Sequence, residues 1–170
     1  HFIDLGGYDK KDLYICGLPK FDKNKRNKIH KKIIVMPTWR PWEFNLVREN
    51  PYESSYYKFL EQIIEQISKE LIKNVIILPH PLFVDALKET KMSKYMIKDV
   101  VYDEILRETD TLITDYSSIA YDAFYRGSNV IFVWTDKDKC MEEYKGHLML
   151  NDNNVFGDVC YNYTDVSEKL

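Results

Sequence analysis

The chain has 170 residues, enough for one domain with a substantial core, and its 45% hydrophobic and 30% charged content argues against disorder. A formal net charge of −3 gives no overall basic field, so we expect no nucleic-acid partner. The three cysteines, Cys16, Cys140 and Cys160, are far apart, which argues against a disulfide framework or a zinc site and favours a reducing, cytoplasmic setting. No apolar run reaches the roughly 18 residues that a membrane span needs.

Short apolar runs alternate with helical patterns in the first half of the chain. Residues 13–16 predict a strand that ends at Gly17, and the basic segment from Lys20 to Lys32 predicts a solvated connection. Residues 32–37 form an apolar run of the kind that is typical of a buried parallel strand.

A helical pattern follows, with Ser54 or Ser55 as its cap. Its apolar stripe recurs at three- and four-residue steps, at Tyr56, Leu60, Ile63, Ile67 and Leu71. Residues 75–78 then predict a second buried strand, which Pro79 and Pro81 end.

The second half of the chain continues the alternation. Its predicted elements are a weaker strand over residues 95–101, a short helix over 102–109, a strand over 111–115, a helix from Ser117 or Ser118 to Arg126 that ends at Gly127, a strand over 129–134, and the start of a helix over 165–170. Such alternation implies βαβ units with right-handed crossovers. We therefore expect an α/β domain with a Rossmann-like parallel sheet and helices on both faces.

Polar side chains follow each of the four main predicted strands. They are Thr38 and Arg40, with Trp39 between them, after the first strand, His80 after the second, Asp115, Ser117 and Ser118 after the third, and Thr135 and Asp136 after the fourth. Open parallel sheets bind ligands beyond the carboxyl ends of their strands. These residues are therefore the candidate substrate-binding site.

The strongest local signal is the step from Asp115 to Ser117 and Ser118. Hydroxyls and backbone N–H groups at the start of a helix suit a phosphate or pyrophosphate, although an ordinary serine cap gives the same pattern. The Asp115 side chain either accepts a ligand hydroxyl or bonds the N–H groups of the turn that follows it.

The candidates after the first two strands also allow two interpretations each. His80 lies between two prolines that fix the backbone, so it either binds and neutralises a phosphate or caps a rigid turn. Arg40 either clamps a phosphate bidentately or is a surface arginine beside Trp39. The segment from Lys20 to Lys32 either attracts an anionic membrane surface or is merely solvated.

Several of these motifs together resemble one known family. They are residues 17–22 (GLPKFD), 34–40 (IVMPTWR), 78–81 (LPHP) and 112–122 (LITDYSSIAYD). The set is similar to the C-terminal domain of the CDP-glycerol glycerophosphotransferase family, the teichoic acid primases and polymerases. The Asp-Tyr-Ser-Ser and Pro-His-Pro elements at this spacing are the specific part of the match.

The resemblance implies the C-terminal half of a GT-B-type enzyme, peripheral at the cytoplasmic face of the cell membrane. Residues 1–170 would be its single nucleotide-donor-binding domain, a fragment of a longer two-domain transferase. The donor would be CDP-glycerol or a similar CDP-activated alcohol, and the acceptor a teichoic acid or another glycan. By analogy His80 is the catalytic group, Ser117 and Ser118 hold the pyrophosphate, and no metal or cofactor is required.

One departure from the family bears on activity. The family's N-terminal half carries a His-Gly element with the catalytic base, and nothing before Gly17 provides it. We therefore expect this chain alone to bind donor and turn over little. The alternatives are a UDP-type glycosyltransferase or epimerase domain of GT-B architecture, although no G-x-G-x-x-G occurs, and a non-catalytic α/β binding module.

Overall fold

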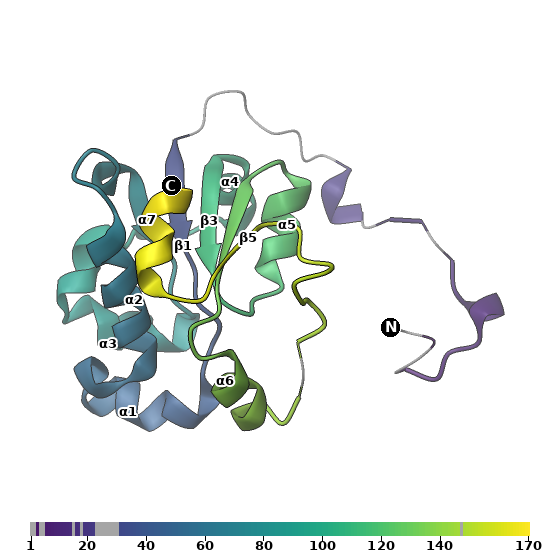
Figure 1. The fold of residues 1–170 in the computed structure, drawn as a ribbon, viewed down its shortest axis with the longest axis horizontal. Helices are drawn as coiled ribbons and strands as arrows, with labels where there is room; N and C mark the ends of the chain where they lie inside the picture. The colour runs from purple at the N-terminus through teal and green to yellow at the C-terminus, as the bar shows by residue number, and fades with distance from the viewer. Residues whose placement is uncertain (1–2, 4–5, 15, 18, 23–30, 147) are drawn as a thin grey trace.

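The computed structural model describes residues 3, 6–14, 16–17, 19–22, 31–146 and 148–170. The described ranges contain a five-stranded sheet in the order β2-β1-β3-β4-β5, and every neighbouring pair is parallel (Figure 1). The strands are β1 (Lys32–Val35), β2 (Val75–Ile77), β3 (Thr109–Thr114), β4 (Asn129–Val133) and β5 (Asp158–Cys160).

The inner strand β1, which lies between β2 and β3, shows why these sequences form a buried parallel sheet. Ile33 pairs with Val75 of β2, and Ile34 pairs with Leu112 of β3. Successive side chains of a strand point to opposite faces, so Ile33 and Val35 enter one core layer and Ile34 enters the other. Both faces are covered, which is the reason that Ile33, Ile34 and Val35 are all apolar and do not alternate with polar residues.

Helices cover both faces of the sheet, as the alternating pattern predicts. They are α1 (Phe44–Glu49), α2 (Ser55–Gln66), α3 (Val84–Lys88), α4 (Tyr102–Arg107), α5 (Ile119–Tyr125), α6 (Lys137–Glu143) and α7 (Val166–Lys169). One core layer contains Leu60 of α2 and Leu87 of α3, and the other contains Ile105 of α4 and Ala123 of α5. The α/β fold with a parallel sheet is confirmed.

Short 3₁₀ helices join these elements. They are η1 (Lys10–Asp12), η2 (Pro19–Phe21), η3 (Pro41–Glu43), η4 (Pro51–Glu53), η5 (Ile72–Asn74), η6 (Pro81–Phe83), η7 (Lys91–Tyr95) and η8 (Tyr163–Asp165). Several of them begin at a proline, whose fixed φ suits the first helical position.

The predicted main helix is confirmed at its start and is too long at its end. The Ser54 hydroxyl accepts a hydrogen bond from the Tyr57 backbone N–H at 3.0 Å, so Ser54 is the cap. The helix stops at Gln66 because Ile67 adopts an extended backbone with a ψ of 128°. Leu71 lies after the end of the helix but still packs against the same core. Its apolar side chain therefore continues the sequence pattern although the helix has already ended.

Two predicted strands are wrong among the described residues. Leu13 and Tyr14 lie in no strand, and Tyr14 is 95% exposed, so an apolar run without a neighbouring strand stays irregular. Over residues 95–101 only Met96 forms an isolated parallel bridge, with Ile77. Asp99 has a φ of 53°, which interrupts extended structure there.

Candidate functional site

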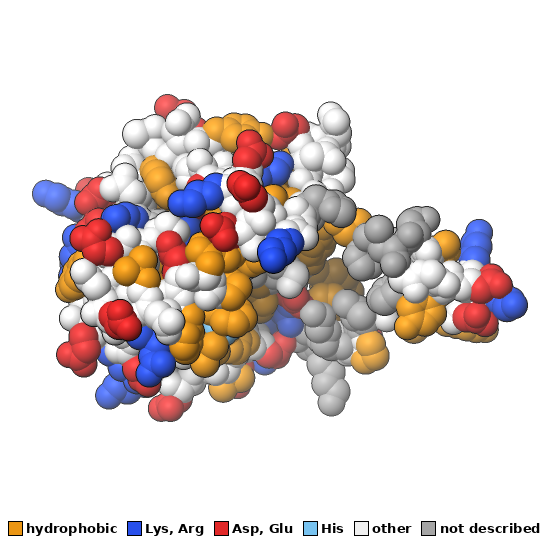
Figure 2. Space-filling model, turned by 90° about the horizontal axis from the view of Figure 1, so that it is seen from below, with side chains coloured by type: hydrophobic (Ala, Val, Ile, Leu, Met, Phe, Trp, Pro, Cys, Tyr) orange, Lys and Arg blue, Asp and Glu red, His pale blue; other side chains and the backbone are white. Residues whose placement is uncertain are grey.

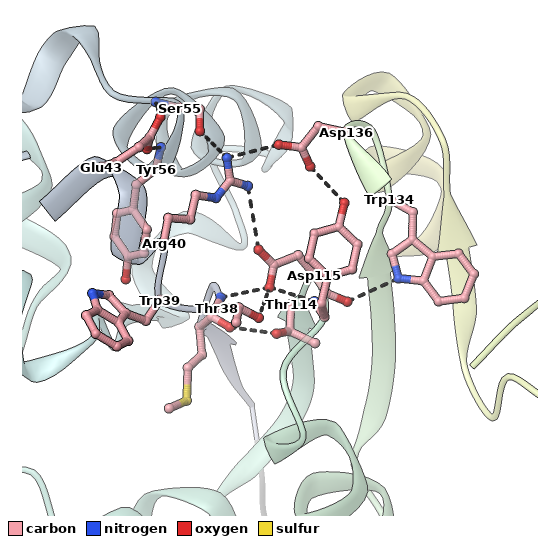
Figure 3. Close-up of polar contacts among 12 residues, drawn as sticks. Thr38, Trp39, Arg40, Glu43, Ser55, Tyr56, Thr114, Asp115, Trp134 and Asp136 are labelled. Carbon is pink, nitrogen blue, oxygen red and sulfur yellow. Dashed lines mark hydrogen bonds and ion pairs between the residues drawn. The ribbon is translucent and has the colours of Figure 1, made fainter. Parts of the chain in front are cut away.

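The loops after β1, β3 and β4 meet at the carboxyl edge of the sheet, as the sequence predicts. Figure 3 shows side chains from these three loops, those of Arg40, Asp115 and Asp136, pointing toward one another. Figure 2 views the molecule from this side and shows hydrophobic side chains gathered between acidic and basic ones.

Arg40 is the centre of this cluster. Its guanidinium lies 2.9 Å from an oxygen of Asp136 and 3.7 Å from an oxygen of Asp115, and it also donates a hydrogen bond to the Ser55 hydroxyl. The Arg40 side chain is only 1% exposed. Burial alone lowers the pKa of Arg40, but the two carboxylates outweigh this effect and raise it, so the guanidinium stays charged.

Asp115 is equally enclosed, with a side chain that is 0% exposed. One of its carboxylate oxygens accepts hydrogen bonds from the backbone N–H groups of Thr38 and Tyr116, both at 2.7 Å, and from the Thr38 hydroxyl. Burial raises the pKa of Asp115, whereas Arg40 and the Thr38 hydrogen bonds oppose the rise. Asp115 thus ties the end of β1 to the end of β3.

These contacts correct two of the predicted roles. Arg40 was expected either to clamp a phosphate or to be a surface arginine beside Trp39, but its side chain is buried between carboxylates and presents no exposed guanidinium to a ligand or to solvent. Asp115 follows the other interpretation, because it bonds the N–H groups of the following turn rather than an exposed ligand hydroxyl. Both residues form the framework under the site.

Asp136 links the same framework to β4. It accepts a hydrogen bond from the Tyr116 hydroxyl at 2.7 Å and pairs with Arg40, while its side chain remains 24% exposed. Burial and the neighbouring Asp136 carboxylate raise the pKa of Tyr116, so its hydroxyl remains a neutral donor. Thr135, the residue before Asp136, is half-buried.

The two serines after β3 differ in exposure and in bonding. The Ser117 hydroxyl accepts a long hydrogen bond from the Ile119 backbone N–H at 3.4 Å, and Ser117 is half-buried. Ser118 is the N-cap of α5, yet its side chain makes no capping hydrogen bond, and it is exposed. The Ser118 hydroxyl is therefore not used to cap the helix.

His80 is held on several sides at the end of β2. Its imidazole stacks on the indole of Trp39, with ring centroids 4.9 Å apart and planes 11° apart. Its backbone N–H donates to the Tyr56 hydroxyl at 3.0 Å, and its Nδ1 accepts from the Leu82 backbone N–H at 3.4 Å. The Nδ1 contact caps η6 and favours the tautomer with the proton on Nε2. Burial lowers the pKa of His80 below its usual range.

A cavity of about 690 Å³ opens beside the His80 turn. It is lined by Pro79 and Pro81 on one side and by the segment that includes Met96, Val100 and Tyr102 on the other. Its volume lies within the range of small-molecule sites, and its lining is mostly apolar with a few charged groups.

Several residues of this region were not predicted from the sequence. They are Tyr56 and Tyr116, together with Glu43, whose carboxylate accepts hydrogen bonds from the backbone N–H groups of Ser55 and Tyr56 at 2.9 and 3.0 Å. Of these three, only Tyr116 could have been found from the sequence, because it lies between the predicted site residues Asp115 and Ser117.

Metal ions and membranes are the remaining points. Within the described ranges no group of three or more His, Cys, Asp or Glu side chains is placed to hold a metal ion. In the same ranges no helix has both the length and the apolar character that a bilayer span requires. The basic segment from Lys20 to Lys32 was expected to attract an anionic membrane, and residues 23–30 of it lie outside the described residues.

Comparison with known proteins gives a consistent set of relatives. Residues 7–170 match the model of a family described as CDP-Glycerol:Poly(glycerophosphate) glycerophosphotransferase. The chain is 24% identical over 183 residues to the minor teichoic acid biosynthesis protein GgaB of Bacillus subtilis (strain 168), which covers 96% of this chain and 20% of that protein. It is 27% identical over 147 residues to the teichoic acid glycerol-phosphate transferase of Staphylococcus aureus (strain NCTC 8325 / PS 47), covering 84% and 36% respectively.

Solved structures show the same fold. Two variants of the wall teichoic acid polymerase TagF superimpose with TM-scores of 0.66 and 0.65 at 19% identity, over 98% of this chain and 44% of theirs. A TagF structure soaked with CDPG superimposes with a TM-score of 0.58 over 82% of this chain and 34% of that one. The chain thus spans less than half the length of each of these relatives.

Proposed function

The chain belongs to the CDP-glycerol:poly(glycerophosphate) glycerophosphotransferase family, and from that membership we propose that residues 1–170 are the donor-binding domain of a longer, two-domain GT-B-type transferase. The domain binds CDP-glycerol or a similar CDP-activated alcohol. The complete enzyme transfers the alcohol phosphate to a teichoic acid or another cell-surface polymer. The observation that carries this proposal is the cavity beside the His80 turn, which is lined by Pro79 and Pro81, the residues on either side of His80.

The nucleoside of the donor occupies this cavity. A cytosine base is flat and apolar on its faces, which suits the surfaces of Pro79, Pro81 and Tyr102. The pyrophosphate then lies toward His80, which separates the two prolines.

The phosphate end of the site depends on hydroxyls and on one imidazole. Arg40 is already neutralised by carboxylates, so it supplies no free charge. The remaining groups are the hydroxyls of Ser117 and Ser118 and the Nε2 of His80. The Nε2–H can donate a hydrogen bond to a phosphate oxygen while Nδ1 keeps its hydrogen bond from the Leu82 backbone N–H.

This arrangement assigns the chain one part of the chemistry. An acceptor hydroxyl forms the new O–P bond, the P–O bond to CMP breaks, and the acceptor proton passes to a base outside this chain. Negative charge grows on the CMP oxygens, where His80 and the serine hydroxyls stabilise it. The catalytic role of His80 is therefore stabilisation of the leaving group.

The surroundings of the enzyme follow from the same proposal. A membrane-linked polymer is the acceptor, and we place the enzyme in the cytoplasm, peripheral at the inner face of the cell membrane. The segment from Lys20 to Lys32 supplies positive charge for an anionic bilayer surface. We expect no nucleic-acid partner, because the net charge of −3 gives no overall basic field.

Calorimetric titration with CDP-glycerol, CMP and a UDP-sugar tests the proposal. We expect cytidine-selective binding that His80→Ala weakens by about 1–3 kcal/mol, the scale of a lost charge-assisted hydrogen bond. Lys69→Ala, an exposed change outside the site, should leave the affinity unchanged. Preference for the UDP-sugar would assign the chain to the glycosyltransferases instead, and a folded sample that binds none of the three would contradict donor binding.

The cavity assignment has its own test in two neighbouring valines. Val100 lines the cavity, whereas Val101 does not line it and is 54% exposed. Val100→Trp should fill the cavity and raise the Kd for CMP at least tenfold, about 1.4 kcal/mol. Val101→Trp adds the same side chain outside the cavity and should leave the Kd unchanged. Equal effects of the two substitutions would place the nucleoside elsewhere.

A further inference from the structure

The ring stack between Trp39 and His80 has no role in the function proposed so far. Trp39 belongs to the loop after β1, and His80 belongs to the loop after β2, so the stack joins the ends of two neighbouring strands. The planes differ by only 11° at a centroid distance of 4.9 Å, which means that the indole covers one face of the imidazole.

Two other contacts restrict rotation of the imidazole ring. Phe83 meets it edge-on, with centroids 6.2 Å apart and planes 67° apart. Nδ1 accepts the backbone N–H of Leu82. The ring is thus held on a face, on an edge and at one nitrogen, and Nε2, across the ring from Nδ1, keeps the proton that it can donate.

Trp39 is itself held firmly enough to act as a support. Its backbone carbonyl accepts a hydrogen bond from the Tyr144 hydroxyl. The residues on either side of it, Thr38 and Arg40, are both tied to Asp115. The indole therefore stands on the buried framework that joins β1, β3 and β4.

Packing alone does not account for a tryptophan at this position. The indole Nε1 of Trp39 is buried and has no hydrogen-bond partner among the described residues. A buried N–H without a partner costs stability, and a phenyl ring would avoid that cost. The large indole face nevertheless stacks on the imidazole of His80 and holds that ring in place.

We propose that Trp39 is a positioning residue for His80: its indole fixes the imidazole so that the Nε2–H is presented to the donor pyrophosphate. The proposal rests on the proposed donor site. Trp39 acts through His80 and makes no contact with the transferred group.

A double-mutant cycle on CDP-glycerol affinity tests this role. Trp39→Leu should raise the Kd roughly 3- to 30-fold in the wild-type background. It should change the Kd less than twofold in the His80→Ala background, because the residue that it positions is then absent. Trp39→Phe, which keeps an aromatic face, should restore most of the affinity. Tyr125→Leu is the control, since Tyr125 is an aromatic residue that is 62% exposed and stacks on Phe21, away from Trp39 and its contacts.

A spectroscopic measurement separates positioning from general loss of structure. In the wild-type chain the ring protons of His80 should be shifted upfield by the indole face, and its ¹⁵N signals should report the Nε2–H tautomer. Trp39→Leu should abolish the upfield shift and mix the tautomers, while the thermal midpoint stays above the assay temperature. Unchanged His80 signals, or a Kd effect of Trp39→Leu that persists in the His80→Ala background, would overturn the proposal.

The two proposals fail in different ways. A wild-type chain that does not bind CDP-glycerol contradicts the donor site itself. Donor binding that His80→Ala weakens and Trp39→Leu leaves intact contradicts only the positioning role.

Discussion

Replacement of Arg40 by methionine is expected to lower the free energy of unfolding by about 3–5 kcal/mol. Methionine keeps a long apolar side chain but removes the charge that faces Asp115 and Asp136. The Asp115 carboxylate is fully buried, so it would lose its compensating cation in a region without solvent. Urea unfolding followed by circular dichroism measures the change through a lower midpoint.

An exposed arginine provides the control for this experiment. Arg48 lies on α1 and is exposed, so Arg48→Met should change the free energy of unfolding by no more than about 0.5 kcal/mol. If Arg40→Met proved equally mild, Asp115 would have to be neutral in the folded chain, and the buried ion pairs would not hold the strand ends together.

A second large effect is expected from a single methyl group at Gly157. A Cβ atom built on this residue would lie 2.3 Å from the backbone carbonyl oxygen of Val130. The Val130 carbonyl group belongs to the backbone and cannot rotate away as a side chain does. Gly157→Ala should therefore push β5 away from β4 and lower the free energy of unfolding by about 3 kcal/mol. Thermal unfolding should show a clear drop in Tm.

Gly146→Ala is the matched control for this substitution. A Cβ atom at Gly146 would meet its nearest neighbour, the Tyr144 carbonyl oxygen, at an ordinary 3.8 Å. We expect a change in Tm of at most a few degrees. A normal Tm for Gly157→Ala would mean that β5 is not packed as closely on β4 as these distances imply.

Four of the five strands could be predicted because each is an apolar run on a sheet covered on both faces. The strand β5 escaped prediction because only Cys160 of its three residues is buried, so it has no apolar run. The helices α1, α3 and α6 have five to seven residues, too few for a repeating apolar stripe. The false strand over residues 95–101 has apolar residues but only one bridging partner.

The place of the site could be predicted more fully than the role of each residue. Polar groups after parallel strands must meet at one edge, whatever their side chains do. Whether an arginine faces a ligand or a carboxylate depends on three-dimensional neighbours, and the partners of Arg40 lie far along the chain at Asp115 and Asp136. The stack of Trp39 on His80 is likewise a contact between separate loops.

The strand order also has a consequence for how the chain is made. β1 lies inside the sheet, yet one of its two neighbours is β3, where Ile34 pairs with Leu112. On a ribosome that adds about 5–20 residues per second, β1 waits roughly 4–16 s with one hydrogen-bonding edge uncovered. Such long-range pairing makes parallel sheets slow to form. In the interval before β3 emerges, the uncovered edge of β1 can pair with strands of other nascent chains, and this is when the chain is most exposed to aggregation.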